Sequence, residues 1–403
     1  MQFSERILQI KPSATLEITA LANAMKAKGI DVIGFGSGEP DFDTPKTIKD
    51  AAIRAIETGK TKYTPAGGIP ELKQAVVNKM KRDNNLEYKT SEITINCGGK
   101  HSFYNLMQVI INEGDEVIVP APYWVSYPPI IQLAGGKPVI VSAAEEKGFK
   151  ITPQDLKKAI TRKTKAVVIN SPSNPTGATY SREELSSLAE ILLANDILII
   201  SDDIYESILY DNRTFFNMAN FSEELRKKTV VLNGVSKAYS MTGWRIGYIA
   251  AGEDIIKKVE ILQSQSTSNP TSISQWASVE ALNGDQSVIA EMVKSFDRRR
   301  KIVTDGLNQV TGVNCLNPEG AFYAFPNVSG VYRLKGWKGI AEKYSSPNNS
   351  AKLTSYLIEE ARVAVVPGVE FGTDENIRLS FATSDENIIK GVERIKEAVE
   401  KLV

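Results

Sequence analysis

Short apolar runs alternate with amphipathic stretches between residues 92 and 250, and this alternation constrains the fold more than any other feature of the sequence. Ser181 and Glu184 form a capping box at the start of one of the helical stretches. Apolar runs joined by helices are typical of a largely parallel sheet covered on both faces, so we predict an α/β fold. The expected strands are Ile93–Asn96, Glu116–Pro120, Pro138–Val141, Ala166–Asn170, Ile197–Ser201, Val230–Asn233 and Ile246–Ala250, and the expected helices include Tyr127–Leu133 and Pro153–Ile160.

The C-terminal part follows a different pattern, in which a long helix over Gln286–Val310 precedes short strands and further helices. We expect the basic run Arg298–Lys301 to be a solvent-exposed face of that helix, and Arg333–Asn349 to be a surface excursion. A chain of 403 residues exceeds the about 250–300 residues at which a single core stops growing. We therefore predict a large domain of residues 46–290 and a small α+β domain that combines residues 1–45 and 291–403.

Composition excludes several classes of protein. The 48 lysines and arginines balance 48 aspartates and glutamates, so the net charge gives no sign of binding to nucleic acid or to an anionic membrane. One histidine, His101, and two cysteines exclude a multi-histidine or four-cysteine metal site. Cys97 and Cys315 fit a reducing compartment. No segment has the character of a secretion signal or the ~20 apolar residues of a membrane span, so we expect a cytoplasmic protein.

Chemically distinctive residues follow four of the expected strands, which is where parallel sheets bind their ligands. Gly98-Gly99-Lys100 opens a helix whose N-terminus suits a phosphate, although a tight turn explains the glycines taken alone. Asn174 stands in a rigid turn rich in proline and glycine, where a capping asparagine is the structural alternative. Asp202 and Tyr205 follow the next strand, where solvated loop acids are the alternative.

Lys237 and Arg245 follow the strand at 230–233. A lysine with a lowered pKa is a nucleophile, and an arginine can hold a phosphate through two hydrogen bonds. The joint occurrence of these residues at strand ends matches the needs of pyridoxal 5′-phosphate. That cofactor requires an amine for its aldehyde, a carboxylate for its pyridine nitrogen, donors for its phenolic oxygen and an anion site for its phosphate.

Eight short motifs occur in a set order along the chain, and they are Gly38–Pro45, Lys62–Pro65, Pro122–Trp124, Asn174–Gly177, Ser201–Tyr205, Ser236-Lys237, Met241–Gly247 and Asn376–Phe381. In these motifs the chain resembles the class I, fold-type I pyridoxal-phosphate aminotransferases over essentially its whole length. Within that class it is most similar to the bacterial aspartate aminotransferases of the γ-type subgroup. The resemblance implies a large domain with a mostly parallel sheet, a small domain built from both termini, and a homodimer with shared active sites.

The resemblance also implies a role for each matching residue. Lys237 would bond covalently to the cofactor aldehyde and, once the substrate amine displaces it, move the substrate proton. Asp202 would pair with the pyridine nitrogen, and Trp124 would stack on the ring. Tyr205 and Asn174 would bond the phenolic oxygen. The phosphate would be held by Gly99, Lys100, Ser236 and Arg245, together with Tyr63 of the neighbouring subunit.

For the substrate, the resemblance implies that Arg378 clamps the α-carboxylate, where a structural ion pair is the alternative for this arginine alone. Asn174, Trp124 and the Gly38 backbone would lie beside that carboxylate. Lys100 would bind the distal carboxylate of a dicarboxylate substrate. Lys11 would be linked to the use of prephenate, unless it is only a surface lysine at a helix start.

The sequence departs from the family pattern at two places. Many relatives carry a serine three positions before the lysine, where this chain has Gly234. We therefore expect the phosphate site to depend more on the helix that starts near Gly99. In other subgroups a histidine supports the aspartate at the pyridine nitrogen, and we do not assign that role to His101.

The expected activity is transfer of the amino group from L-aspartate to 2-oxoglutarate, and the use of prephenate is left open. The alternatives on the same scaffold are an aminotransferase for aromatic or a broad range of amino acids, and a pyridoxal-phosphate lyase. A regulatory protein that retains the scaffold is disfavoured because such proteins carry an additional DNA-binding module, and the chain has neither net positive charge nor spare length for one.

Overall fold

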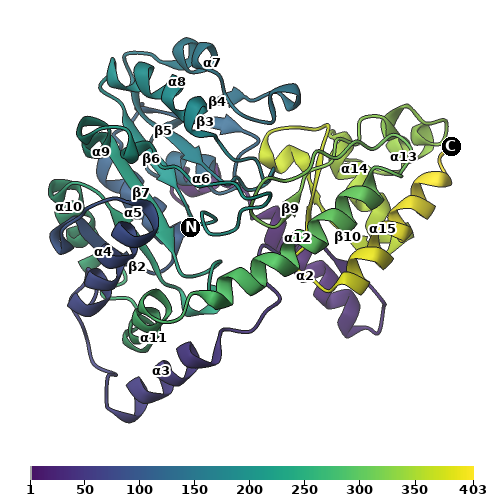
Figure 1. Cartoon of the computed structure of the whole chain (residues 1–403). Coiled ribbons are helices and arrows are strands. Elements are labelled where there is room, and N and C mark those ends of the chain that lie inside the picture. Colours follow the sequence, from purple (N-terminus) through teal and green to yellow (C-terminus); the bar gives the residue numbers. More distant parts are fainter. Residues whose placement is uncertain (1) are drawn as a thin grey trace.

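The computed structural model describes residues 2–403 and contains a seven-stranded sheet with helices on both faces (Figure 1). The strand order is β2-β8-β7-β6-β5-β3-β4. β8 runs antiparallel to both of its neighbours and all other pairs are parallel, which confirms the predicted α/β fold. The strands are β2 (Ile93–Asn96), β3 (Glu116–Ala121), β4 (Lys137–Ser142), β5 (Thr164–Asn170), β6 (Leu198–Asp202), β7 (Thr229–Gly234) and β8 (Gly247–Ala250).

Successive residues of the central strands enter apolar clusters on opposite faces of this sheet, which explains why the strands read as continuous apolar runs. Val117 and Val119 pack with α5, α6 and α10, whereas Ile118 packs with α7 and α8. The helices around the sheet are α3 (Lys46–Glu57), α4 (Pro70–Asn84), α5 (Gly99–Ile110), α6 (Tyr127–Leu133), α7 (Pro153–Ala159), α8 (Arg182–Leu193), α9 (Glu223–Lys228), α10 (Glu253–Ser264) and α11 (Ser272–Asn283). The predicted capping box starts α8, because the Ser181 hydroxyl accepts from Glu184 N and the Glu184 carboxylate accepts from Ser181 N. None of the helices within residues 2–403 is long and apolar enough to cross a membrane.

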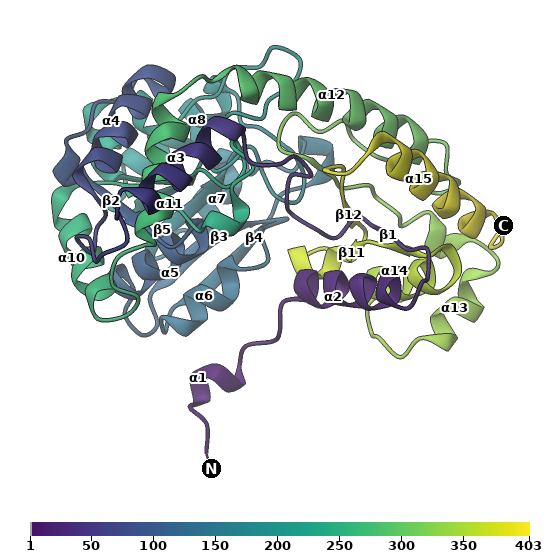
Figure 2. The ribbon, with the colours of Figure 1, turned by 90° about the horizontal axis from the view of Figure 1, so that it is seen from below.

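The remaining elements combine both ends of the chain (Figure 2). β1 (Ile33–Gly34) pairs in parallel with β10 (Val363–Ala364), and a three-stranded sheet has the order β11-β12-β9. The other elements here are α2 (Ala14–Ala27), α12 (Ser287–Leu307), β9 (Tyr323–Ala324), α13 (Trp337–Lys343), α14 (Asn349–Tyr356), β11 (Val366–Pro367), β12 (Ile377–Ser380) and α15 (Asp385–Glu400). The short helix α1 (Glu5–Leu8) contacts α6 instead.

One apolar cluster joins the two groups of elements, since it includes Tyr205 and Tyr210 after β6 as well as Phe296 of α12 and Ile388 of α15. α12 itself runs from the helices beside the large sheet to the C-terminal elements (Figure 1). This cluster therefore extends from the C-terminal elements to the loop after β6, while both faces of the large sheet have apolar clusters of their own. The domain boundaries at residues 45 and 290 stay a prediction.

The prediction that Arg298–Lys301 is a solvent-exposed face holds for Arg298 and Lys301 and is wrong for the two residues between them. In the basic run, Arg299 and Arg300 are 7% and 3% exposed, because α12 packs on α15 and on neighbouring loops that supply carboxylates. Arg300 forms a fork with Asp211, with donor–acceptor distances of 2.7 and 2.8 Å. The expected surface excursion Arg333–Asn349 is confirmed, because all of its residues except Trp337 are exposed or half-buried. It contains helix α13, whose first residue, Trp337, is 6% exposed and packs on the ring of Tyr332. Aromatic burial therefore holds that segment against the core.

Candidate active site

A cavity of about 350 Å³ lies beyond the carboxyl ends of β5, β6 and β7. Pockets for small molecules have volumes of roughly 300–1,000 Å³. The cavity receives side chains from strand ends, from the start of α5, from the segment after β1 and from β12. Of the predicted site residues, those lining it are Gly38, Gly99, Lys100, Trp124, Asn174, Asp202, Tyr205, Ser236, Lys237, Arg245 and Arg378.

The Lys237 amine is in the interior of this site, in the loop after β7. Its Nζ donates to the Gly38 carbonyl oxygen over 2.6 Å. Burial of the amine, with the guanidinium groups of Arg245 and Arg378 nearby, lowers the pKa of Lys237 to about 8. A substantial fraction of the amine is therefore neutral close to physiological pH, and a neutral amine is a nucleophile and a base.

Asp202 ends β6, and two neighbouring elements hold this residue, one through its carboxylate and the other through its backbone. The hydroxyl of Tyr127, the first residue of α6, donates to Asp202 Oδ2 over 2.5 Å. The Asn170 side chain at the end of β5 donates to the Asp202 carbonyl oxygen over 2.9 Å. Burial raises the pKa of Asp202, while the bond from Tyr127 lowers it and so favours the ionised form.

Tyr127, Asn170 and Tyr323 are site residues that sequence reasoning missed. The hydroxyls of Tyr205 and Tyr323 lie 2.7 Å apart, and both rings face the cavity. Tyr127 was predicted only as the first residue of a helix. The one available signal was its position three residues after Trp124, whose ring it meets edge-on at 5.2 Å.

The start of α5 and the nearby Arg245 form a site suited to an anion. Gly98 adopts φ +90°, which favours glycine, and a Cβ built on Gly99 would have no atom within 4 Å. A Cβ at Gly247, by contrast, would lie 2.5 Å from the Gly98 carbonyl carbon, so β8 approaches this turn closely. Arg245 donates to the Thr242 carbonyl oxygen over 2.8 Å. Free backbone N–H groups, a helix of 12 residues and a guanidinium all favour negative charge here.

Arg378 occupies β12 on the opposite side of the cavity and is 2% exposed. Its terminal nitrogens donate to Asn174 Oδ1 over 2.9 Å and to the Gly36 carbonyl oxygen over 2.7 Å, while its Nε has no partner among residues 2–403. The guanidinium carbon lies 4.6 Å from the ring centroid of Tyr323. A buried guanidinium that is bonded only to neutral oxygens is ready to receive an anion.

The charges lining the cavity are unbalanced. Four basic side chains line it, at Lys100, Lys237, Arg245 and Arg378, against the single carboxylate of Asp202. Within the described part of the chain, none of the four lies within 4 Å of a carboxylate oxygen. Burial, and to a lesser extent Arg245, lowers the pKa of Lys100, as expected where cations are gathered without counter-ions.

Two predicted residues lie outside the cavity. Tyr63 is 92% exposed and lies in a shallow depression with Lys62 and Ser268. Lys11 is exposed, although Ser13, Thr15 and Leu16 from the same segment do line the cavity.

The unassigned His101 accepts from Cys97 N over 3.2 Å, and burial lowers the pKa of His101. It therefore acts as a neutral acceptor in the turn before α5. Within residues 2–403 no cluster of His, Cys, Asp and Glu could hold a metal ion.

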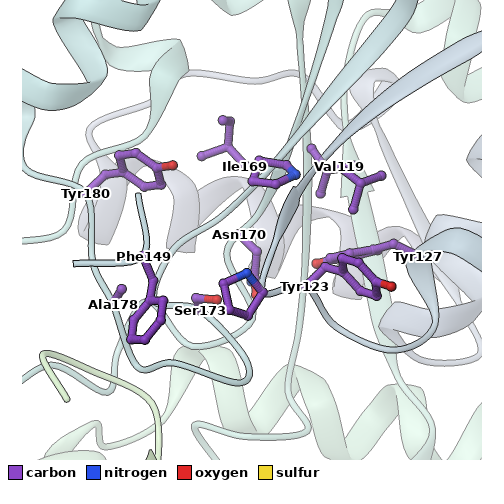
Figure 3. A pocket seen from close by; sticks show the side chains of 12 residues that line it. Val119, Tyr123, Tyr127, Phe149, Ile169, Asn170, Ser173, Ala178 and Tyr180 are labelled. Carbon is purple, nitrogen blue, oxygen red and sulfur yellow. The ribbon is translucent and has the colours of Figure 1, made fainter. Parts of the chain in front are cut away.

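A second, much smaller cavity adjoins the first (Figure 3). It has a volume of about 20 Å³ and is bordered by aromatic rings, including Tyr123 and Tyr180. Tyr127 and Asn170 line both cavities. A space of this size holds about one water molecule, so it cannot accept a substrate.

Comparisons with known proteins agree with this geometry. The aminotransferase class I and II family matches residues 30–395. The aspartate aminotransferase of Bacillus subtilis is 51% identical over 401 residues, which is 100% of each chain. The aspartate/prephenate aminotransferase of Nitrosomonas europaea is 51% identical over 98% of this chain and 99% of that one.

Solved structures agree as well. The crystal structure of the aspartate aminotransferase from Rhizobium meliloti gives a TM-score of 0.94 at 44% identity and covers 100% of both chains. The aspartate aminotransferase from Thermus thermophilus with maleate gives a TM-score of 0.91 at 40% identity, covering 99% of this chain and 100% of that one. With a fold and sequence shared from end to end, this chain belongs to the class I and II aminotransferase family.

Proposed function

We propose that this protein is a pyridoxal-phosphate-dependent aspartate aminotransferase, which converts L-aspartate and 2-oxoglutarate to oxaloacetate and L-glutamate. The observation that carries the proposal is the cavity with four basic side chains and one carboxylate. Such a charge excess suits ligands with several negative charges, namely a phosphate group and a dicarboxylate substrate. Full-length relatives that are named aspartate aminotransferases support it, and so does a relative solved with the dicarboxylate maleate.

The residues of the cavity fit pyridoxal phosphate. The Lys237 amine suits its aldehyde, and the buried Asp202 carboxylate suits its ring nitrogen. The start of α5 at Gly99, with Ser236 and Arg245, suits its phosphate. Trp124 lines the cavity where a ring can stack, and Tyr205 and Asn174 line the same space. When bound, the cofactor would supply a pyridinium ring that accepts the electron pair left at the substrate Cα.

Three groups of the chain would then act on the substrate. Arg378, whose Nε has no partner within residues 2–403, would hold the α-carboxylate, with Asn174 beside it. Lys100 would hold the distal carboxylate. The Lys237 amine would take the proton from the substrate Cα at its Nζ and later return one. Its pKa of about 8 suits proton transfer near neutral pH.

A panel of half-reactions tests the proposal. Purified protein loaded with cofactor should change its visible absorbance when L-aspartate is added, and 2-oxoglutarate should reverse the change. Lys237→Ala should abolish the cycle. Protein without visible absorbance, or without a response to L-aspartate, would refute the proposal. A faster response to phenylalanine than to L-aspartate would favour the aromatic aminotransferase, and release of ammonia without transfer would favour a lyase.

Prephenate is a second candidate substrate, which the Nitrosomonas europaea relative supports through its name. The segment that carries Lys11 reaches the cavity through Ser13 and Thr15, which supports a role for this segment although Lys11 itself does not line the cavity. Lys11→Ala should lower the turnover of prephenate and leave that of L-aspartate unchanged. An equal loss with both substrates would defeat a selective role for Lys11.

The active form is proposed to be a homodimer in which Tyr63 completes the phosphate site of the neighbouring subunit. The 92% exposure of Tyr63 in one chain supports this, because a large aromatic side chain normally has a packing partner. Mixing inactive Tyr63→Ala and Lys237→Ala proteins should restore some activity, since one site of the hybrid then has both native residues. No recovery after subunit exchange would contradict shared sites. A cytoplasmic location remains a proposal, supported by the two free cysteines.

A further inference from the structure

Residues 36–42, a segment that we call the strap, lie between β1 and α3 (Figure 2), and Gly38 of this segment lines the cavity. Two strap carbonyls bond to cationic site residues. The Gly38 oxygen accepts from Lys237 Nζ over 2.6 Å, and the Gly36 oxygen accepts from Arg378 Nη2 over 2.7 Å. The position of the strap therefore determines the positions of the carbonyl oxygens that accept from Lys237 and Arg378.

The end of the strap before Gly36 is fixed by backbone hydrogen bonds. Phe35 N donates to the Ala364 oxygen and Ser380 N donates to the Phe35 oxygen, each over 2.8 Å. These bonds attach the strap to β10 and to the end of β12. They hold one end only, so the placement of Gly38 also depends on what holds the other end.

Arg299 of α12 helps to hold that other end, where the Thr242 hydroxyl also donates to the Glu39 carboxylate. Its terminal nitrogens donate to the two Asp41 carboxylate oxygens over 2.7 and 2.9 Å. The same guanidinium lies 5.1 Å from the Phe42 ring centroid, and Phe42 meets Phe296 edge-on at 5.5 Å. The Arg299 side chain is 8% exposed, so this planar fork works in a partly desolvated site, where it is stronger than on the surface.

The neighbouring Arg298 shares with Arg299 a contact to α15 but does not contact the strap. Both arginines donate to Asp385 at the start of α15, Arg298 Nε over 2.6 Å and Arg299 Nε over 3.2 Å. Arg298 is 58% exposed and does not contact Asp41. A comparison of the two arginines therefore separates the link between α12 and α15 from the link to the strap.

We propose that Arg299 is a positioning residue for the reaction: through Asp41 it holds the strap so that the Gly36 and Gly38 carbonyls orient Arg378 and Lys237. This inference rests on the proposed aminotransferase activity. Because the Gly36 carbonyl bonds to Arg378, which would hold the substrate α-carboxylate, loosening the strap weakens substrate binding more than it slows turnover.

The test uses the loaded enzyme and the variants Arg299→Gln, Asp41→Asn and, as the matched control, Arg298→Gln. Asp41→Asn keeps the shape of a side chain that is 30% exposed, so it creates no cavity and no steric clash. We expect KM for L-aspartate to rise about tenfold in Arg299→Gln and Asp41→Asn, with kcat within about threefold, because a change acting on bound geometry appears chiefly in binding. Hydrogen exchange of peptides covering residues 35–42 should accelerate in both, and Arg298→Gln should match the native enzyme in both measurements.

Several results would overturn the positioning role. It fails if KM in Arg299→Gln and Asp41→Asn stays within twofold of Arg298→Gln, or if KM rises while exchange in residues 35–42 does not change. It also fails if the double variant loses much more than either single variant, because two residues acting through one contact should not be additive. Native enzyme inactive towards L-aspartate would refute the proposed function instead, and the exchange measurement would still report on the strap.

Discussion

Replacing Lys237 by methionine should stabilise the cofactor-free protein at neutral pH, because the native chain holds this amine beside three further cations in one cavity. Burial, with Arg245 and Arg378 nearby, lowers the pKa of Lys237 from 10.5 to about 8. One pKa unit corresponds to about 1.4 kcal/mol, so a fully desolvated amine would cost roughly 3 kcal/mol of unfolding free energy. Because the amine borders an open cavity and donates to Gly38, we expect a smaller cost of about 2 kcal/mol.

The sign of the pH dependence follows from the two proton affinities. Below the native pKa of about 8 the amine is protonated in both folded and unfolded chains, and the whole cost is present. Between that value and 10.5 only the unfolded chain keeps the proton, so the unfolding free energy of the native protein rises with pH. Above 10.5 both states are neutral and the cost has gone. The stability advantage of Lys237→Met should therefore shrink by about 2 kcal/mol as the pH rises from neutral to 10.5.

Urea unfolding of both cofactor-free proteins across this pH range measures the difference directly. Other groups titrate over the same range, but their contributions cancel in the difference. Better or worse packing of methionine adds a constant that does not depend on pH. Lys158→Met on the exposed face of α7 provides the control for the exchange of a lysine for a methionine outside the cavity. An advantage of Lys237→Met that stays constant or grows with pH would refute the reasoning.

Three further changes test the geometry of the site. Tyr127→Phe removes the hydroxyl that donates to Asp202 over 2.5 Å. Because a hydrogen bond to a charged group is worth about 1.5–3 kcal/mol, the affinity for the cofactor in a fluorescence titration should fall about tenfold or more. An unchanged affinity would contradict this role of Tyr127. Arg378→Gln should raise KM for L-aspartate about 100-fold by removing a charged fork, and a normal KM in steady-state kinetics would place the α-carboxylate elsewhere. Gly247→Ala puts a methyl group 2.5 Å from the Gly98 carbonyl carbon, so calorimetry should record a loss of about 1–3 kcal/mol of stability, and a stability equal to that of the native chain would mean that the turn can move aside.

The sheet and most of the cavity were predictable because their signals are local. A strand buried on both faces, such as Glu116–Ala121, must be apolar at nearly every position, and that property is visible in the sequence. Residues directly after parallel strands meet at one edge of the sheet. Asp202 and Lys237 were therefore found without knowledge of the fold around them.

Contacts that depend on how distant elements pack could not be predicted in this way. Tyr127 bonds to Asp202 only because α6 begins beside the end of β6, 75 residues further along the chain. Arg299 was predicted to be exposed because arginines in a basic run usually are. Its partner Asp41 is 258 residues away, and only the packing of α12 against the strap brings the two together. The prediction for Arg299 failed because its charged side chain is buried, and the hydrophobic periodicity of the sequence does not indicate which charged side chains are buried.

A chain of zero net charge thus concentrates four basic side chains and one carboxylate around a single cavity. Like charges in a partly desolvated space raise the free energy of the folded chain, and burial together with the neighbouring cations lowers the pKa of both Lys100 and Lys237. An anionic ligand removes that same repulsion when it binds, and a ligand that binds only the folded chain stabilises it. The same repulsion between the cations therefore lowers the stability of the ligand-free chain and raises its affinity for anions. Lys237→Met should consequently be more stable than the native protein at neutral pH, and added dicarboxylate, such as maleate, should stabilise it less than it stabilises the native protein. If Lys237→Met is more stable but is stabilised by the dicarboxylate as much as the native protein, the repulsion between the cations is not the source of the affinity for anions.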